Sequence, residues 1–387
     1  MTTRDVTWTE ASARRLARQG LLAPAENASP ATVAGAMLGA HAQVLSAAEL
    51  SVALRLDGAS RADVRTALWT NGSVVKTFGP RGTVHLLPSA DLPLWTGALG
   101  ALPTGRDPMP AHVRMTPEQS EAVVAAIADA LADTALTVDE LTEAIVARTG
   151  SWAGDRVMDA FQTKWPRWRQ ITHRAAYRGA LCFGPNRGRK VTYTHPHRLL
   201  PGFTPMAGPA ALAGLVRRYL YAYGPATPRH FAGWLAMPKT WAGKLFAGLA
   251  AEGDIEETGF EDGRAWVVAG DTAFPAEPVR GVRLLPYFDA YSIAAQPRER
   301  LFAGEAYARA LAGGQAGNFP VLLVDGAVAG VWHQRRSGRR IEVTVEPLGT
   351  LTAGQRRELE TQVERTGEIL EGKPELTVGK VMVGPHA

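Results

Sequence analysis

Two polar side chains, His41 and Gln43, interrupt the small and apolar segment GAHAQVLSAAELSVALR at residues 39–55. Near pH 7 a neutral imidazole can accept a hydrogen bond from water, and an amide can both donate and accept. In an extended chain residues i and i+2 face the same side, whereas in a helix they diverge by about 200°. If the preceding helix ends at Gly39, the pair could hold a water against an electron-poor sugar carbon. The alternative is that both side chains only satisfy backbone groups between two helices.

Basic side chains gather at the turns of two predicted strand pairs, SVVKTFGPRGTVHLLP at 73–88 and LCFGPNRGRKVTYTH at 181–195. Such turns can lie against the phosphate backbone of DNA. For any one residue an ordinary solvated turn is as good an explanation, but two basic turns together favour DNA. The candidate phosphate contacts are Lys76 and Arg81 in the first turn, Arg187, Arg189 and Lys190 in the second, and Arg169 and Arg174 in the segment before it.

The turn QRRSGRR at 334–340 is the strongest single electrostatic signal, because it places Arg335, Arg336, Arg339 and Arg340 at one predicted hairpin tip. Four neighbouring cations repel one another unless an anion is close. The narrow minor groove of DNA attracts such a tip. We therefore expect this turn to contact DNA.

The common motifs of metal, nucleotide and acyl-transfer chemistry are absent. Cys182 is the single cysteine, His195 and His197 lack a second cluster at ligand spacing, and no P-loop, GxSxG or dinucleotide fingerprint occurs. We expect no metal and no cofactor. Asp289, in LLPYFDAY at 284–291, could be a second catalytic carboxylate, but capping a turn is the better explanation. Trp165, Trp168 and Tyr177 have helical spacing and are more typical of a core than of a base-stacking surface.

The composition favours a polyanionic partner. The chain carries a formal net charge of +5, with a pI near 9.4, mostly from arginine. A coding bias that exchanges lysine for arginine would explain the same excess. The first 20 residues contain no apolar signal core, and no stretch approaches the roughly 18 apolar residues of a membrane span, so we expect a cytoplasmic protein.

The same pattern, short amphipathic helices followed by a strand pair, occurs three times along the chain and is typical of a winged helix. The first copy has predicted helices at 31–40, after Ser29 and Pro30, and at 61–69, then strands at 74–78 and 83–87. The second has helices from Pro117 and over 137–148, a third near 159–179, and the strand pair at 181–195. The third has helices over 212–223, 227–234 and 239–252, and a hairpin turning at Asp262-Gly263.

From about residue 276 strands predominate, in VRGVRLLPYF, NFPVLLVDGAVAGVWHQ, GRRIEVTVEP and ELTVGKVMVG, with one charged helix over 352–372. This pattern predicts a small, partly closed β-barrel. The predicted domains are 1–108, 109–202, 203–275 and 276–387.

The chain resembles the bacterial AlkZ-type DNA glycosylases. The resemblance rests on GAHAQ at 39–43, RGTVHLLP at 81–88, LLPYFDAY at 284–291 and FPVLLVDGAVAGVW at 319–332. It implies an α+β fold of three tandem winged-helix domains in a C-shape, followed by a small C-terminal β-barrel. It also implies removal of alkylated purines, bulky or crosslinked adducts included, from duplex DNA.

The family pairs Gln-x-Gln or Gln-x-Asp where this chain has His41 and Gln43, so the resemblance implies that these two residues are catalytic. Without a lysine beside the motif, hydrolysis without a Schiff-base lyase step is expected. We expect a monomer that acts on DNA at the nucleoid. Two other functions stay open at this point: a transcriptional or architectural DNA-binding protein, and a resistance protein that sequesters a genotoxin.

Overall fold

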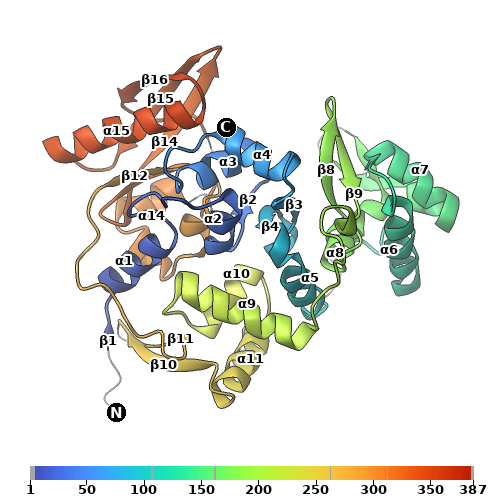
Figure 1. Ribbon diagram of the computed structural model, residues 1–387. Helices are drawn as coiled ribbons and strands as arrows, with labels where there is room; N and C mark the ends of the chain where they lie inside the picture. Colours follow the sequence, from blue (N-terminus) through green and yellow to red (C-terminus); the bar gives the residue numbers. More distant parts are fainter. Residues whose placement is uncertain (1–4, 106–108, 161–162, 262, 312, 385–387) are drawn as a thin grey trace. The chain divides into compact units, whose positions relative to one another are not determined.

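Short helices alternate with strand pairs along most of the chain, as Figure 1 shows. The computed structural model describes residues 5–105, 109–160, 163–261, 263–311 and 313–384. The chain divides into two compact units, one of residues 1–67 and 216–387 and one of residues 68–215. The four predicted domains stay a prediction. In the described ranges no helix is long and apolar enough to cross a membrane.

The first unit begins with two helices, α1 and α2, whose starts follow from their caps. Helix α2 begins at Pro30, and the Ser29 side chain accepts a hydrogen bond from the Thr32 amide, as predicted. It ends at Ala36 rather than at residue 40, because Leu38 and Gly39 have left-handed backbone (φ 57° and 93°). The elements of this stretch are β1 (Asp5–Val6), α1 (Trp8–Arg18), α2 (Pro30–Ala36), β2 (Ala40–His41), α3 (Leu45–Ala53) and α4 (Arg61–Trp69).

The third predicted helix-and-hairpin copy is present with nearly the predicted bounds. Its elements are α9 (Gly208–Tyr223), α10 (Pro228–Leu235), α11 (Lys239–Ala251), β10 (Ile255–Phe260) and β11 (Gly263–Val268). Strand β1 adds to β10 in parallel, so the hairpin is part of a three-stranded sheet. Of the predicted turn Asp262-Gly263, Asp262 lies outside the described residues.

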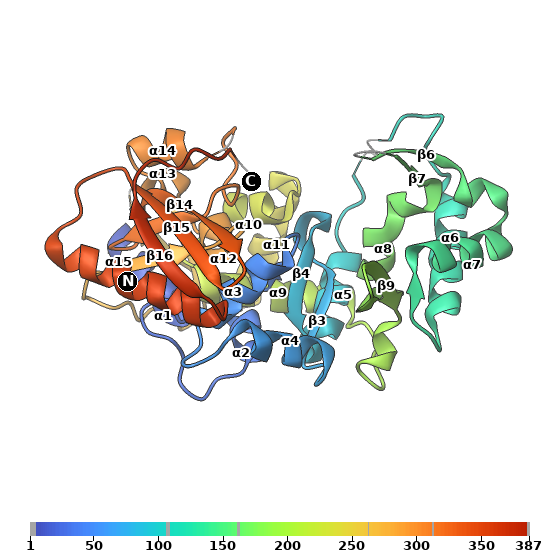
Figure 2. The same ribbon diagram turned by 90° about the horizontal axis from the view of Figure 1, so that it is seen from above.

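The C-terminal strands form one five-stranded sheet in the order β12-β13-β14-β15-β16, antiparallel except for the last pair. Among the described residues it is an open sheet with β12 and β16 at its edges, so the predicted barrel is not confirmed. Helix α15 runs alongside β16 (Figure 2). The elements are β12 (Val282–Leu285), β13 (Val321–Val324), β14 (Ala327–Ser337), β15 (Arg340–Pro347), α15 (Ala353–Ile369) and β16 (Lys373–Val378).

Three short helices between β12 and β13 were not predicted: α12 (Ala290–Ala294), α13 (Arg298–Leu301) and α14 (Glu305–Ala310). Their apolar side chains share a core with the sheet and α1, and this core includes Leu16, Leu285, Tyr291, Phe302 and Val331. Burial of this cluster holds α1, the three helices and the sheet together.

The second unit contains the first two predicted strand pairs. The first pair has the predicted strands, and Thr116 and Thr137 begin the two predicted helices through capping boxes. The elements are β3 (Val74–Phe78), β4 (Val84–Pro88), α5 (Leu92–Gly100), α6 (Pro117–Leu131), β5 (Leu136–Thr137), α7 (Val138–Thr149), β6 (Arg156–Asp159), β7 (Lys164–Pro166), α8 (Thr172–Tyr177), β8 (Cys182–Arg187) and β9 (Lys190–Thr194), with short 3-10 turns between some of them.

The predicted helix near 159–179 is wrong in its first half. Residues 164–166 form a strand and 167–171 a 3-10 turn, and α8 begins only at Thr172. Pro166 accounts for this, because a proline disfavours helical backbone at the residue before it. Trp168 is fully buried in the core, as its spacing suggested, whereas Trp165 is 41% exposed. Residues 161–162 lie outside the described ranges.

Candidate active site

His41 and Gln43 can act together only if the helix before them ends by Gly39, and the backbone meets this condition. The helix before it ends at Ala36, the left-handed Leu38 and Gly39 turn the chain, and His41 lies in the short extended strand β2. Gln43 follows in a bend directly before α3. His41 is only 7% exposed, whereas Gln43 is exposed. One buried and one exposed polar group therefore lie two residues apart on non-helical chain.

The imidazole of His41 stacks on the ring of Phe288, with 4.6 Å between ring centroids and 28° between ring planes. Phe288 has left-handed backbone (φ 55°), and its amide donates to the carbonyl of Gly317 at 2.9 Å. This ring contact brings the 39–43 segment and the LLPYFDAY segment together and limits how the imidazole can turn.

Asp289, next to Phe288, is part of a buried ion pair. Arg55 Nη1 donates to Asp289 Oδ2 and Nη2 to Oδ1, both at 2.8 Å, and both side chains are fully buried. Ser51 Oγ donates to the same carboxylate at 2.5 Å, and Oδ1 accepts from the Tyr291 amide at the start of α12. Asp289 therefore caps a turn, as predicted, and also neutralises Arg55.

The ion pair positions Phe288 through α3. Ser51 lies on α3 and Arg55 just beyond its end, while Gln43 precedes its start. One helix thus connects the exposed amide to the anchor of the stacked ring. Sequence reasoning did not select Phe288, Ser51 or Arg55. The available signal was the charge of Arg55 at the end of a largely apolar run, since such charges are buried only when paired.

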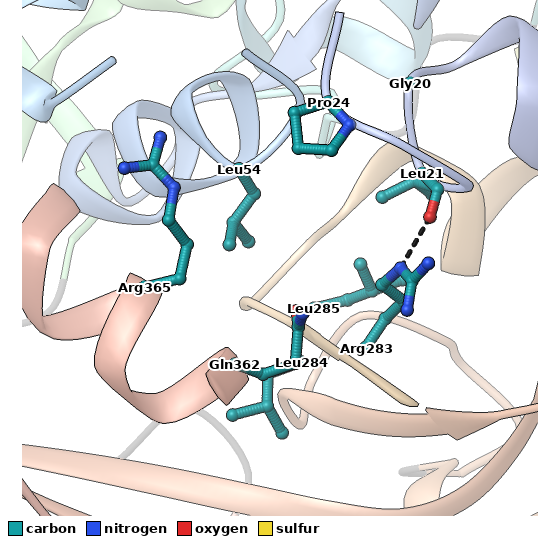
Figure 3. A pocket seen from close by; sticks show the side chains of 9 residues that line it. All are labelled: Gly20, Leu21, Pro24, Leu54, Arg283, Leu284, Leu285, Gln362 and Arg365. Carbon is teal, nitrogen blue, oxygen red and sulfur yellow. Dashed lines mark hydrogen bonds between the residues drawn. The ribbon is translucent and has the colours of Figure 1, made fainter. Parts of the chain in front are cut away.

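A small cavity in the same unit is lined by Leu54, Leu284, Arg283 and Arg365, among others (Figure 3). Its volume is about 140 Å³, whereas ligand pockets usually measure roughly 300 to 1,000 Å³. Arg283 donates to the carbonyls of Leu21 and Leu22, and Arg365 to three carbonyls between residues 53 and 59. Both guanidinium groups thus form hydrogen bonds with the protein's own backbone carbonyls. No three His, Cys, Asp or Glu side chains in the described ranges could hold a metal ion.

Comparison with known proteins decides the family. Residues 34–369 match the family described as DNA glycosylase AlkZ-like. The chain belongs to the AlkZ-like DNA glycosylase family. An interstrand DNA cross-link repair glycosylase of Streptomyces sahachiroi is 32% identical over 334 residues, which cover 84% of this chain and 87% of that protein. The solved structure of Streptomyces sahachiroi DNA glycosylase AlkZ is similar with a TM-score of 0.81 and 28% identity, over 97% of this chain and 100% of that one.

This AlkZ-like chain is therefore a DNA glycosylase with a mixed α+β fold, and its substrate is DNA. The family assignment favours an enzyme over the two binding-only alternatives. It leaves the roles of His41, Gln43 and the basic residues as predictions.

The basic residues of the second unit differ in whether they already have carboxylate or aromatic partners within the protein. Arg187 pairs with Glu140, and Lys190 lies 3.2 Å from Asp139. Lys76 lies over the ring of Phe183, and Arg169 over that of Trp165. Arg174 and Arg189 are exposed, and Arg81 is half-buried.

The first strand-pair turn, residues 79–82, is held by Tyr177. Its hydroxyl donates to the Gly79 carbonyl at 2.7 Å and accepts from the Gly82 amide at 2.8 Å. Burial raises the pKa of Tyr177 to about 12, so the hydroxyl stays protonated and can do both. Arg81, with φ 61°, is thus presented from a fixed turn.

The four arginines of the 334–340 tip are not equivalent. Arg336 donates to the carbonyls of Leu370 and Glu371 at the end of α15 and to that of Gly338. Arg340 lies 2.7 Å from Glu375, and Arg335 lies 3.5 Å from Glu342. The expected repulsion is therefore partly offset within the protein. Arg339 is exposed, and its side chain has no ion pair or hydrogen bond with any residue that the structure describes.

Proposed function

We propose that this DNA glycosylase hydrolyses the N-glycosidic bond of alkylated purines in duplex DNA, with His41 and Gln43 acting on the attacking water. The observation that carries the proposal is the pair of a stacked imidazole and an exposed amide two residues apart on non-helical chain, His41 in a short strand and Gln43 in the bend that follows. His41 would accept a proton from the water while Gln43 orients it towards the sugar. Positioned proton transfer of this kind contributes about 10²- to 10⁴-fold.

Alkylated purines suit a site with so few catalytic groups. Alkylation at N7 of guanine or N3 of adenine makes the base cationic and therefore a good leaving group, so the enzyme needs mainly to place water and stabilise the cationic sugar. Without a lysine in the 39–55 segment, the product is an abasic site rather than a cleaved strand.

The relative from Streptomyces sahachiroi is named for interstrand cross-link repair, and we extend this activity to bulky and crosslinked adducts here. Such adducts are difficult to extrude into a tight pocket. Hydrolysis from the minor groove, with the 334–340 tip as the probe, avoids that difficulty. The protein would act as a monomer on DNA in the cytoplasm.

We also assign DNA contacts to the basic residues predicted from the sequence, on a scaffold of three winged helices at 1–108, 109–202 and 203–275 followed by the 276–387 domain. The capped helices followed by hairpins in each stretch support this assignment. Phosphate contacts would fix the register of the enzyme on the duplex without selecting a sequence.

The test measures base release, under single turnover, from duplexes carrying N7-methylguanine or a bulky N7-guanine adduct. Wild type is compared with His41→Ala and Gln43→Ala at matched DNA occupancy. We expect both variants to lose about 100-fold or more in rate. His41→Gln, which restores an amide at the first position, should retain more activity than His41→Ala.

The control is His112→Ala, which removes an exposed imidazole in the second unit and should release base at the wild-type rate. Tight DNA binding by wild type without release from either duplex would contradict the proposed substrates. Release unaffected by both alanine variants would contradict the assigned residues.

A further inference from the structure

The segment around the candidate pair is buried except for one short exposed stretch. Residues 37–42 and 47–53 are all buried, whereas Gln43, Val44 and Ser46 are exposed and Leu45 is half-buried. Val44 is 43% exposed, one of a small number of large apolar side chains that the described surface exposes to this extent. An apolar side chain therefore stands beside the amide that is proposed to hold the water.

Local stability does not explain a valine at this position. Val44 is the N-cap residue of α3 and makes no side-chain hydrogen bond to the first turn. Ser, Thr, Asp and Asn are favoured at N-caps because their side-chain oxygen accepts a first-turn amide, and valine offers none. With 43% of its surface also exposed, Val44 is only partly packed against the fold.

The exposed stretch at residues 43–46 is also unsuited to attract phosphate. Between residues 37 and 53 the one charged side chain is Glu49, which is buried and paired with Arg65. Electrostatic attraction to DNA must therefore come from other parts of the protein, and the exposed stretch can add only apolar and amide contacts.

We propose that Val44 is the apolar contact that seats Gln43 against duplex DNA. Its two methyl groups would pack on the deoxyribose and base edges beside the lesion and set the depth to which Gln43 enters the groove. Apolar side chains are used in this way by proteins that work in the minor groove. The same contact would exclude bulk water from the glycosidic bond, so that the bound water is the one that reacts. This inference rests on the proposed function.

The test uses Val44→Ser in the full-length protein and the N7-methylguanine duplex. Serine removes both methyl groups and supplies the missing cap, so we expect a higher Tm than wild type. Single-turnover base release should fall about tenfold or more, which corresponds to the loss of one good contact. DNA affinity and its salt dependence should stay within about twofold of wild type, since no phosphate contact is removed.

Two further variants make the result specific. Val44→Ile keeps an apolar side chain and should release base within about threefold of wild type, while Val44→Thr keeps the shape and replaces one methyl with a hydroxyl, so its rate should be intermediate. A 2-aminopurine placed beside the lesion reports stacking, and its fluorescence on binding should change less with Val44→Ser than with Val44→Ile.

Wild-type release by Val44→Ser together with slow release by Gln43→Ala would overturn the inference and leave the proposed function standing. A lower Tm with a parallel loss of DNA affinity would also overturn it, because that pattern indicates a structural role. Wild-type release by both Gln43→Ala and Val44→Ser would instead reject the proposed function, and the inference with it.

Discussion

The neutral form of His230 takes part in the cap at the start of helix α10. It is the third residue of α10, and its Nδ1 accepts a hydrogen bond from the Thr227 amide at 3.2 Å, while the Thr227 hydroxyl accepts from the His230 amide. Burial, followed by the positive charges of Arg15 and Arg229, lowers its pKa from 6.5 to about 4, with Glu299 acting in the opposite direction. Protonation would remove the acceptor and break half of this capping box.

Stability should therefore fall as pH falls through the window between 6.5 and about 4. In this window the unfolded chain binds a proton that the folded chain excludes, so acid favours unfolding. From pH 7 to 4.5 we expect His230 to contribute a loss on the order of 2 kcal/mol. Denaturant unfolding of wild type and His230→Gln at both pH values measures it, since glutamine caps without titrating.

The matched control is His112→Gln, which makes the same substitution at an exposed histidine. Burial also lowers the pKa of His173, His195 and His333, so His230→Gln should reduce the acid loss rather than abolish it. An unchanged difference between pH 7 and 4.5 in His230→Gln would show that its burial is compensated.

Among the elements, the β14–β15 hairpin carries neighbouring arginines in different surroundings. Arg336 binds the carbonyls at the end of α15, where a cation also interacts favourably with the helix dipole. Arg339, at the same tip, is exposed and has no side-chain partner among the described residues. Substitutions at Arg336 and Arg339 can therefore test a fold role and the proposed DNA contact separately.

Arg336→Ala should lower the free energy of unfolding by about 1 to 3 kcal/mol, because it leaves carbonyls of α15 without a charged donor. Arg339→Ala should leave stability within about 0.5 kcal/mol of wild type and lower the salt slope of DNA binding by about 1. Urea unfolding and binding titrations at several salt concentrations measure both. Equal effects of the two substitutions on stability would contradict the separate fold role of Arg336, and an unchanged DNA affinity in Arg339→Ala would contradict the proposed DNA contact of Arg339.

At the scale of the molecule, the net charge of +5 predicts strongly salt-dependent DNA binding. If about five of the proposed cations contact phosphates, the slope of log Kobs against log salt is roughly −4.5. Affinity then falls by roughly 10²- to 10³-fold between 50 and 200 mM salt. Arg187 and Lys190 already have carboxylate partners, so they should contribute less than Arg174 and Arg189.

Binding of wild type to undamaged duplex at four salt concentrations measures this slope. A slope near zero would mean that the arginine excess reflects coding bias rather than a DNA surface. With a slope near the expected value, Arg174→Ala and Arg189→Ala, compared with Lys190→Ala, would identify which cations contact phosphate.

The starts of helices could be predicted from local sequence, because each cap is a contact over three residues. Ser29, Thr116, Thr137, Thr227 and Thr352 all begin the predicted helices. The ends of helices could be predicted less closely from local sequence. The left-handed backbone at Leu38, which ends α2 early, has no signal in the leucine itself, since leucine rarely adopts it.

The sequence by itself determined the class of the protein, the caps, the hairpin turns and the candidate pair His41 and Gln43, because these depend on residue type and short spacing. Only the tertiary structure decided that Phe288 stacks on His41, that Arg55 neutralises Asp289, that the C-terminal sheet is open, and that carboxylates and helix carbonyls engage the arginine tip. Each of these depends on residues far apart in the chain that meet when burial of apolar surface brings their elements together. Local periodicity and residue spacing do not indicate which distant residue a side chain will contact.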